Sequence, residues 1–194
     1  MKGKMIKSFI AGLALVLGIS AASPICASAA WKQDSNGWWN TEGSSYSTGW
    51  KQIDGSWYYF ASNGYMQTGW VNDNGSWYYL TNSGAMKTGW INDNNSWYFL
   101  NANGVMQTGW VNVNGTWYYL NPVSNGYKGA MQTGWLNDNG TWYYLQSNGA
   151  MKTGWLNDNG TWYYLNSNGS MKTGWLLDTD GNWYYLQSNG AMAK

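Results

Sequence analysis

The feature that most constrains this chain is an internal repeat, the triplet Thr-Gly-Trp. Its copies begin at Thr48, Thr68, Thr88, Thr108, Thr133, Thr153 and Thr173. Successive copies lie 20, 20, 20, 25, 20 and 20 residues apart. A fixed period of roughly 20 to 50 residues is typical of solenoids, in which each unit buries its apolar surface only against its neighbours. The sequence therefore predicts an extended array of small stacked units.

A second aromatic block of the type Trp-Tyr-Tyr follows each triplet. The two Trp residues of a unit are 7 positions apart, as in Trp70 and Trp77, except for a separation of 8 in the last unit. A divergent unit opens the array with Trp31 and Trp38. We therefore expect eight units over residues 31–194, with no stretch in that range left over for a separate catalytic domain.

The residues between the paired Trp positions predict tight turns. Five units carry dipeptides that accept a positive φ at both turn positions, namely Asp54-Gly55, Asn74-Gly75, Asn114-Gly115, Asn139-Gly140 and Asn159-Gly160. Such pairs favour a two-residue type I′ turn between antiparallel strands. Asn94-Asn95 fills the same place, and the extra residue near Asp180-Gly181 indicates a bulged or three-residue turn. The predicted fold class is all-β, a solenoid of about eight consecutive β-hairpins.

Hairpin pairing also predicts which side chains share a face. A turn at Asn74-Gly75 pairs Trp70 with Tyr79 and Asn72 with Trp77. Paired residues project to the same side and neighbours along a strand alternate. The two faces are therefore Trp70, Trp77 and Tyr79 on one side, and Val71, Tyr78 and Leu80 on the other. One face must be buried by stacking, while the other is at least partly available.

The aromatic content bears on what the available face does. The chain has 17 Trp and 16 Tyr, whereas a core built for packing alone consists mostly of Leu, Ile and Val. One interpretation is that all these rings are core, because a 20-residue unit cannot form a core of its own. The scarcity of aliphatic residues instead favours a binding role for the Trp face.

The composition excludes most catalytic chemistry. The chain has no His and no Arg, and its one Cys is Cys26. A Ser-His or Cys-His nucleophile pair and a His- or Cys-ligated zinc therefore cannot be built in residues 31–194. We interpret the recurring Asp residues near the turns as turn residues, because Asp is common there; they are Asp54, Asp73, Asp93, Asp138 and Asp158. We expect no catalytic residue, no metal and no cofactor, and the net charge of +1 provides no basic surface for nucleic acid.

The N-terminal 30 residues have the pattern of a secretory signal peptide. Lys2, Lys4 and Lys7 precede an apolar run at 9–19, and small residues follow at 27–30. The run is far shorter than the roughly 20 residues that span a bilayer, which argues against a membrane anchor, and the residues before Cys26 are a poor match to a lipidation site. We expect cleavage after Ala29 or Ala30 and a secreted chain with no stable membrane insertion. It would carry 7 Lys against 9 acidic residues, with no cysteine for a disulfide.

The unit from Thr153 to Met171 is the basis of a family resemblance. Its Thr-Gly-Trp and Trp-Tyr-Tyr-Leu blocks, followed by Met, resemble the choline-binding or cell-wall-binding repeats of Gram-positive surface proteins and murein hydrolases. The resemblance covers about residues 31–192. It implies a left-handed solenoid of β-hairpins in which choline groups of teichoic acid occupy aromatic cages between consecutive hairpins. In that family two aromatics come from one hairpin and a third from the next, often with a Met nearby.

Carried onto this chain, the resemblance implies five choline-binding cages. These are Trp50, Trp57 and Tyr78; Trp70, Trp77 and Tyr98; Trp90, Trp97 and Tyr118; Trp135, Trp142 and Tyr163; and Trp155, Trp162 and Tyr184. A five-residue insertion within 122–129 is expected to disturb the cage between Trp110/Trp117 and the following unit. The first unit is expected to act as a cap rather than as a full site.

Three functions remain open at this point. The leading one is a non-catalytic module that binds the choline of teichoic or lipoteichoic acid and holds the protein at the cell wall. The alternatives are a glucan-binding repeat protein and a structural surface stalk. Converging rings favour a methylated ammonium, whereas single flat rings flanked by Asn and Asp favour a sugar. A homodimer formed through the C-terminal units also remains open.

Overall fold

The computed structural model describes residues 30–124 and 127–193, and within them it contains strands and turns but no helix. Accordingly, that part of the chain has no helix long and apolar enough to cross a membrane. The predicted signal peptide lies outside the described residues, apart from Ala30.

The strands form one three-stranded sheet and seven two-stranded hairpins. The first sheet comprises β1 (Trp31–Asp34), β2 (Gly37–Glu42) and β3 (Ser45–Tyr46). The hairpins are β4 (Gly49–Ile53) with β5 (Ser56–Phe60), β6 (Gly69–Asp73) with β7 (Ser76–Leu80), β8 (Gly89–Asp93) with β9 (Ser96–Leu100), β10 (Gly109–Val113) with β11 (Thr116–Leu120), β12 (Gly134–Asp138) with β13 (Thr141–Leu145), β14 (Gly154–Asp158) with β15 (Thr161–Leu165), and β16 (Gly174–Leu177) with β17 (Trp183–Leu186). The predicted all-β solenoid of hairpins is confirmed.

The turns confirm the predicted geometry. Asn74 and Gly75 have φ values of 49° and 85°, the positive pair that a type I′ turn needs, and Asn94-Asn95 adopts 48° and 63°. The register pairs Trp70 with Tyr79 and Asn72 with Trp77, as expected. In the last hairpin the amide of Asp178 donates to the carbonyl of Asn182 at 3.0 Å, which leaves a three-residue loop between them.

Consecutive hairpins are joined by backbone hydrogen bonds from the loop that follows each one. The amide of Met86, after β7, donates to the carbonyl of Trp57 in the preceding hairpin at 2.8 Å. The same bond recurs at each step, for example from Met106 to Trp77 and from Met131 to Trp97. This bond fixes how far each hairpin is displaced from its neighbour.

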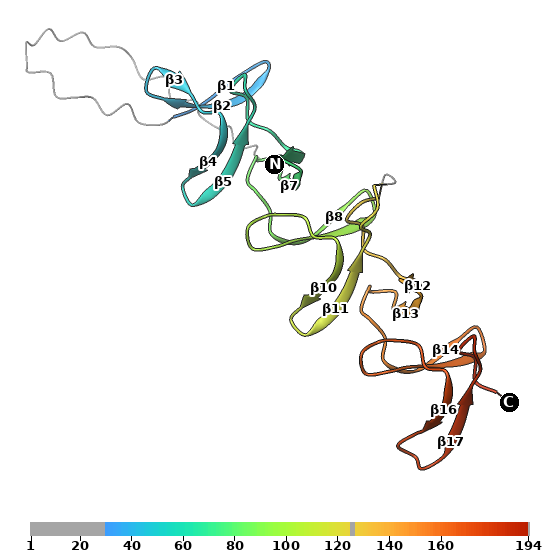
Figure 1. Ribbon diagram of the computed structural model, residues 1–194. Coiled ribbons are helices and arrows are strands. Elements are labelled where there is room, and N and C mark those ends of the chain that lie inside the picture. Colours follow the sequence, from blue (N-terminus) through green and yellow to red (C-terminus); the bar gives the residue numbers. More distant parts are fainter. Residues whose placement is uncertain (1–29, 125–126, 194) are drawn as a thin grey trace, which may run out of the picture.

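A column of buried side chains follows the axis of the array. It consists of the last residue of each second strand, at 0–1% exposure: Phe60, Leu80, Leu100, Leu120, Leu145, Leu165 and Leu186. Figure 1 shows an elongated molecule with the first sheet at one end and β16–β17 at the other. Hairpins β4–β5, β10–β11 and β16–β17 are drawn in the same orientation (Figure 1), so the direction of the hairpins repeats every third unit.

Candidate ligand-binding sites between the hairpins

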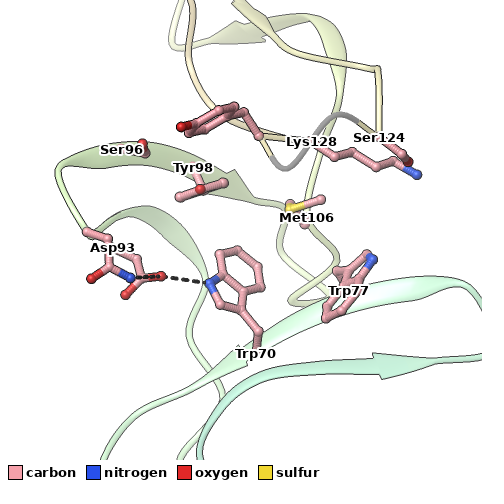
Figure 2. A pocket seen from close by; sticks show the side chains of 10 residues that line it. Trp70, Trp77, Asp93, Ser96, Tyr98, Met106, Ser124 and Lys128 are labelled. Carbon is pink, nitrogen blue, oxygen red and sulfur yellow. Dashed lines mark hydrogen bonds between the residues drawn. The ribbon is translucent and has the colours of Figure 1, made fainter.

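Each candidate site joins two Trp residues of one hairpin to a Tyr of the next. Trp70 on β6 meets Tyr98 on β9 with ring centroids 4.9 Å apart and planes at 69°. Trp77 on β7 lies 6.4 Å from Trp70 at 81°. Figure 2 shows these three rings converging on one pocket. They therefore form three walls with differently oriented π-faces rather than one flat platform.

This arrangement repeats at every step between units. The centroid distance from the first Trp of a unit to the Tyr of the next is 4.6–5.0 Å in all seven cases. The pairs are Trp31–Tyr58, Trp50–Tyr78, Trp70–Tyr98, Trp90–Tyr118, Trp110–Tyr143, Trp135–Tyr163 and Trp155–Tyr184. The structure thus brings together the Trp-Tyr contact of every cage that the sequence predicted.

The exposure of the second Trp shows that these rings are not all core. Trp77 is 38% exposed and Trp97 is 46% exposed, whereas Leu80 and Leu100 at the ends of the same strands are 0% exposed. The buried column of strand-end side chains therefore packs the units together, whereas the second Trp of each site stays open to solvent. The open indole faces are therefore accessible to a ligand in the cavity between two hairpins.

A methionine lines each of the five cavities between hairpins, and a glycine lies close to it at every one of them except the cavity at Trp155. Met106 lines the Trp70 site (Figure 2). Gly129 has φ +84°, and a Cβ built there would lie 2.5 Å from the Met106 sulfur. Five further Gly–Met pairs have the same close approach. Glycine is needed at these positions for both its φ and its missing side chain.

A carboxylate of the following hairpin holds the first Trp of most sites. The indole Nε1–H of Trp70 donates to Asp93 at 3.0 Å. Equivalent bonds of 2.7–3.1 Å join Trp50 to Asp73, Trp110 to Asp138, Trp135 to Asp158 and Trp155 to Asp178. The turn interpretation of these Asp residues was thus incomplete, although Asp54 does occupy a turn position with φ 49°. The regular separation between each Trp and its Asp, usually 23 residues, is the sequence pattern that could have predicted these hydrogen bonds.

Val113 interrupts this series. It occupies the strand position that Asp93 has in β8, so the indole of Trp90 has no carboxylate from this position. Trp90 still meets Tyr118 at 4.8 Å. The Trp90–Tyr118 contact is therefore formed without the indole-to-carboxylate hydrogen bond that holds the first Trp at most other sites.

At four of the five cavities, a loop from two units further along closes the wall; the exception is the cavity at Trp155. The Trp50, Trp57 and Tyr78 cavity, of about 380 Å³, is bounded by Met86 and by Ala102-Asn103 after β9. Cavities of about 320–380 Å³ accompany the sites that begin at Trp110, Trp135 and Trp155. The site at Trp70 is larger, about 540 Å³, and it is bounded by Ser124, Tyr127 and Lys128.

Two expectations about irregular units were wrong. The rings of Trp110, Trp117 and Tyr143 line a cavity of about 380 Å³, with Trp110 and Tyr143 4.7 Å apart. The insertion does not disturb this site, because the loop after a hairpin covers the site that begins two units earlier. The insertion therefore borders the Trp70 site. Counting units along the sequence does not show this, because the loop and the site lie two units apart.

The first unit is the second correction. Trp31 lies 6.5 Å from Trp38 and 4.9 Å from Tyr58, which matches the spacing at Trp70. The amide of Met66 donates to the carbonyl of Trp38 at 2.7 Å, as the other Met residues do at their steps. The first unit therefore assembles the same three rings instead of acting only as a cap.

Titratable groups near the sites favour neutral tyrosines. Burial, and then the charge of Asp138, raises the pKa of Tyr119, which packs against Trp110 at 5.1 Å. The hydroxyl of Tyr184 donates to Asp180 at 2.7 Å, and this hydrogen bond raises the pKa of Tyr184. The carboxyl pKa of Asp180 is lowered, first by its hydrogen bond from the Asn182 side chain. Among the described residues, no group of three or more His, Cys, Asp or Glu is placed to hold a metal ion.

Such a site can bind a cation that has no hydrogen-bond donor. Three π-faces attract a positive charge electrostatically without requiring a hydrogen bond. A quaternary ammonium group has this chemistry. The fold and the sites thus define a solenoid of β-hairpins that presents aromatic cages between its units.

Comparisons with known proteins identify the family. The choline-binding repeat model matches residues 47–88, 87–127 and 152–194, and a cell wall binding repeat model matches 133–151. The chain belongs to the family of choline-binding repeats. No curated protein matches its sequence.

Solved structures from Streptococcus pneumoniae share the fold. CbpJ is 45% identical, with a TM-score of 0.74 over 81% of this chain and 56% of CbpJ. Choline binding protein F, solved in the presence of a peptidoglycan analogue, is 44% identical, with a TM-score of 0.71 over 80% of this chain and 55% of that protein. The modular autolysin LytC is 28% identical, with a TM-score of 0.58 over 85% of this chain and 39% of LytC. The chain thus spans about half the length of CbpJ and of choline binding protein F.

Proposed function

We propose that this chain is a non-catalytic module that binds choline groups of a cell-wall polymer, such as teichoic or lipoteichoic acid, in the cages between its hairpins. The observation that carries the proposal is the repeated convergence of two Trp and one Tyr, with the second Trp exposed by about 40%. The cage residues are those of the five predicted sites, together with Trp31, Trp38 and Tyr58 and with Trp110, Trp117 and Tyr143.

The energetics explain why many sites are needed. Each ring contributes about 0.5–2 kcal/mol by cation–π attraction. Three rings give a net affinity of roughly 3–4 kcal/mol, which corresponds to a dissociation constant in the millimolar range. Linking such sites along a polymer that bears many choline groups raises the avidity by about 10² to 10⁴.

The test is retention on a tertiary- or quaternary-amine resin followed by elution with free choline. We expect elution at millimolar choline and none with the same concentration of a glucose oligomer. Retention on a glucan matrix instead of the amine resin would favour glucan binding, and retention on neither matrix would favour a structural stalk. Converging rings support choline over glucan, because a sugar stacks on a single flat ring flanked by hydrogen-bonding groups.

The cellular setting forms part of the same proposal. We expect export through the N-terminal signal, with an N-terminus at Ala30 or Trp31, and attachment to the cell wall. N-terminal sequencing of the exported protein tests this, and an intact Met1 on the surface form would contradict it. Homodimerisation through the C-terminal units stays a prediction, and sedimentation of the purified chain with and without choline would test it.

A further inference from the structure

The loop residue that precedes each methionine is a large aromatic only in the loop after β5, where it is Tyr65. In the later loops the same position holds a smaller residue: Ala85, Val105, Ala130, Ala150, Ser170 or Ala191. The loop after β5 contacts the first unit, because the amide of Met66 donates to the carbonyl of Trp38 on β2 at 2.7 Å. A large ring is thus placed where it can reach the first sheet.

Inside the array, the first Trp of one unit holds the next hairpin through two contacts. Trp50 packs on Tyr78 with ring centroids 4.6 Å apart, and its indole N–H donates to Asp73 at 3.1 Å. Within the described residues no unit precedes β1 and β2, so no such Trp lies before them. The register of β1 with β2 nevertheless places Trp39 and Asp34 at the equivalent positions. The two partners of such a Trp are therefore present in the first hairpin.

Tyr65 makes both of these contacts. Its ring lies edge-on to Trp39, with centroids 6.1 Å apart and planes at 83°. Its hydroxyl donates to the Asp34 carboxylate at 2.9 Å. A backbone hydrogen bond from Asn36 is the first cause of the lowered pKa of Asp34, and the Tyr65 hydroxyl lowers it further, so this acceptor is charged at neutral pH. A tyrosine from the following unit thus supplies the ring and the donor that a preceding Trp supplies elsewhere.

The same contacts bear on the first cage, which consists of Trp31, Trp38 and Tyr58. Its two Trp residues come from the first hairpin, whereas Tyr58 comes from the next one and lies 4.9 Å from Trp31. Tyr65 directly precedes Met66, whose amide bonds to the carbonyl of Trp38, so Tyr65 joins the two parts of this cage at their boundary. Elements at the end of an array open locally at little cost unless they are tied down. A cage binds its ligand only while its two hairpins are docked, and its apparent affinity falls in proportion to the docked fraction.

We propose that Tyr65 is a positioning residue: it stands in for the Trp of a preceding unit, holds β1 and β2 against the second hairpin and so keeps the first cage assembled. The attachment of the first hairpin follows from the contacts of Tyr65 alone. Its effect on ligand affinity rests on the proposed choline binding. The first cage is thereby expected to bind like an interior cage, although it lies at the end of the described array.

Hydrogen exchange tests the attachment without any ligand. Tyr65→Ala introduces the residue most common at this loop position, so the loop itself should fold normally. We expect the Met66 amide to exchange about 10-fold faster in this variant, because its bond to Trp38 breaks whenever the first hairpin opens. Tyr65→Phe retains the ring and loses the donor, so its effect should be smaller. Val105→Ala is the matched control at the same position of an interior unit, and it should leave the exchange of the Met106 amide unchanged.

A choline titration of ¹⁵N-labelled protein tests the consequence for binding. The indole N–H signals of Trp38 and Trp77 are assigned with single Trp→Phe variants. In Tyr65→Ala the apparent affinity at Trp38 should fall about 3- to 10-fold, as the docked fraction of the first hairpin falls, and in Tyr65→Phe it should fall by less. The affinity at Trp77, in an interior cage, should stay at the wild-type value in both variants, which also shows that the array remains folded. Val105→Ala should leave both affinities unchanged.

The outcomes separate this inference from the proposed function. If Tyr65→Ala speeds exchange at Met66 no more than Val105→Ala does at Met106, Tyr65 does not hold the first hairpin, whether or not choline binds. If exchange is faster but the affinity at Trp38 is unchanged, Tyr65 only stabilises the fold and its positioning role is wrong. If choline moves no indole signal in the wild type, choline binding itself is wrong and the effect on affinity falls with it, while the exchange experiment still tests the attachment.

Discussion

At the scale of single residues, a carboxylate of the next hairpin holds the first Trp of most cages in its orientation. The indole N–H of Trp70 is partly buried and donates to a charged acceptor at 3.0 Å, a type of bond that contributes about 1.5–3 kcal/mol when intact. Chance placement of Asp in turns does not account for five such bonds. The carboxylate also keeps the indole from rotating out of the wall of the cage.

The pair Asp93 and Val113 gives a reciprocal prediction. Asp93→Val should lower the free energy of unfolding by about 1–2 kcal/mol and weaken choline binding at the Trp70 site several-fold, because the indole loses its acceptor. Val113→Asp should strengthen the Trp90 site by adding one. Urea unfolding and the indole N–H shift of each Trp measure both effects. Unchanged indole shifts in both variants would show that the hydrogen bond does not position the ring.

Tyr119 makes a pH-dependent contribution. Its folded-state pKa is raised above the ordinary value of 10.0, so the folded protein retains the proton when the unfolded chain loses it. Stability is therefore fully present below pH 10 and falls as the pH rises through and beyond that value. The melting temperature should decline above pH 10, and less steeply in Tyr119→Phe. Phenylalanine is tolerated there, since Phe99 has the equivalent place beside Trp90.

A control separates titration from the loss of a hydroxyl. Tyr144→Phe makes the same change at the same position of the next hairpin and serves as the matched control for the loss of a hydroxyl. Equal slopes in all three proteins would assign the alkaline loss of stability to groups other than Tyr119.

At the scale of the hairpin, sequence reasoning succeeded wherever the interactions were local. Asn-Gly pairs specify type I′ turns through the φ values that they tolerate, so turn, register and face followed from a few residues. The Trp-Asp bond, the loop that closes most of the cavities and the site of action of the insertion connect residues one or two units apart. Their positions depend on how successive hairpins are displaced and rotated, which no short stretch of sequence encodes by itself.

The close approach of Gly104 to Met86 gives a prediction for the loop that follows each hairpin. Gly104→Ala would place a Cβ 2.4 Å from the sulfur of Met86, at φ +79°. We expect a loss of about 1–2 kcal/mol from the left-handed backbone, plus displacement of Met86 into the Trp50, Trp57 and Tyr78 cavity. Choline binding at that site should therefore weaken together with stability, as followed by urea unfolding and the Trp57 indole signal.

Gly75→Ala is the matched control for this change. Gly75 has φ +85°, but a Cβ there would meet nothing within 4 Å. It should therefore lose the backbone contribution alone and leave every cage intact. If both variants bind choline equally well, the close approach of glycine to methionine does not shape the site.

At the scale of the whole molecule, stability and binding share the same contacts. Each cage lies between two hairpins, so a ligand in the cage adds a contact to those that already join the units: a few rings, the buried column, one Met-to-Trp backbone bond and, at most steps, one Trp–Asp hydrogen bond. In an array of this type stability is approximately a sum of unit and interface contributions. A ligand that binds at every interface therefore stabilises the solenoid along its whole length.

This linkage predicts a rise in melting temperature with free choline. A ligand that binds only the folded array stabilises each site by RT ln(1 + [L]/Kd), about 1.4 kcal/mol per site at ten times a millimolar Kd. Several sites together should raise the melting temperature by many degrees at tens of millimolar choline. A melting temperature that stays constant over that range, measured by circular dichroism, would contradict the cages.

Avidity distinguishes Trp residues that bind the polymer from Trp residues that only stabilise the fold. Replacing Trp70 and Trp77 together by Leu retains apolar side chains but removes two π-faces from one of the seven steps between units. Binding to choline-bearing polymer should weaken modestly, whereas the same change in four or five units should weaken it by orders of magnitude. The open face of Trp77 predicts only a modest loss of stability in the double variant. If the double variant instead unfolds at low urea while polymer binding by its folded fraction is unchanged, the paired Trp residues are structural and the array binds by other means.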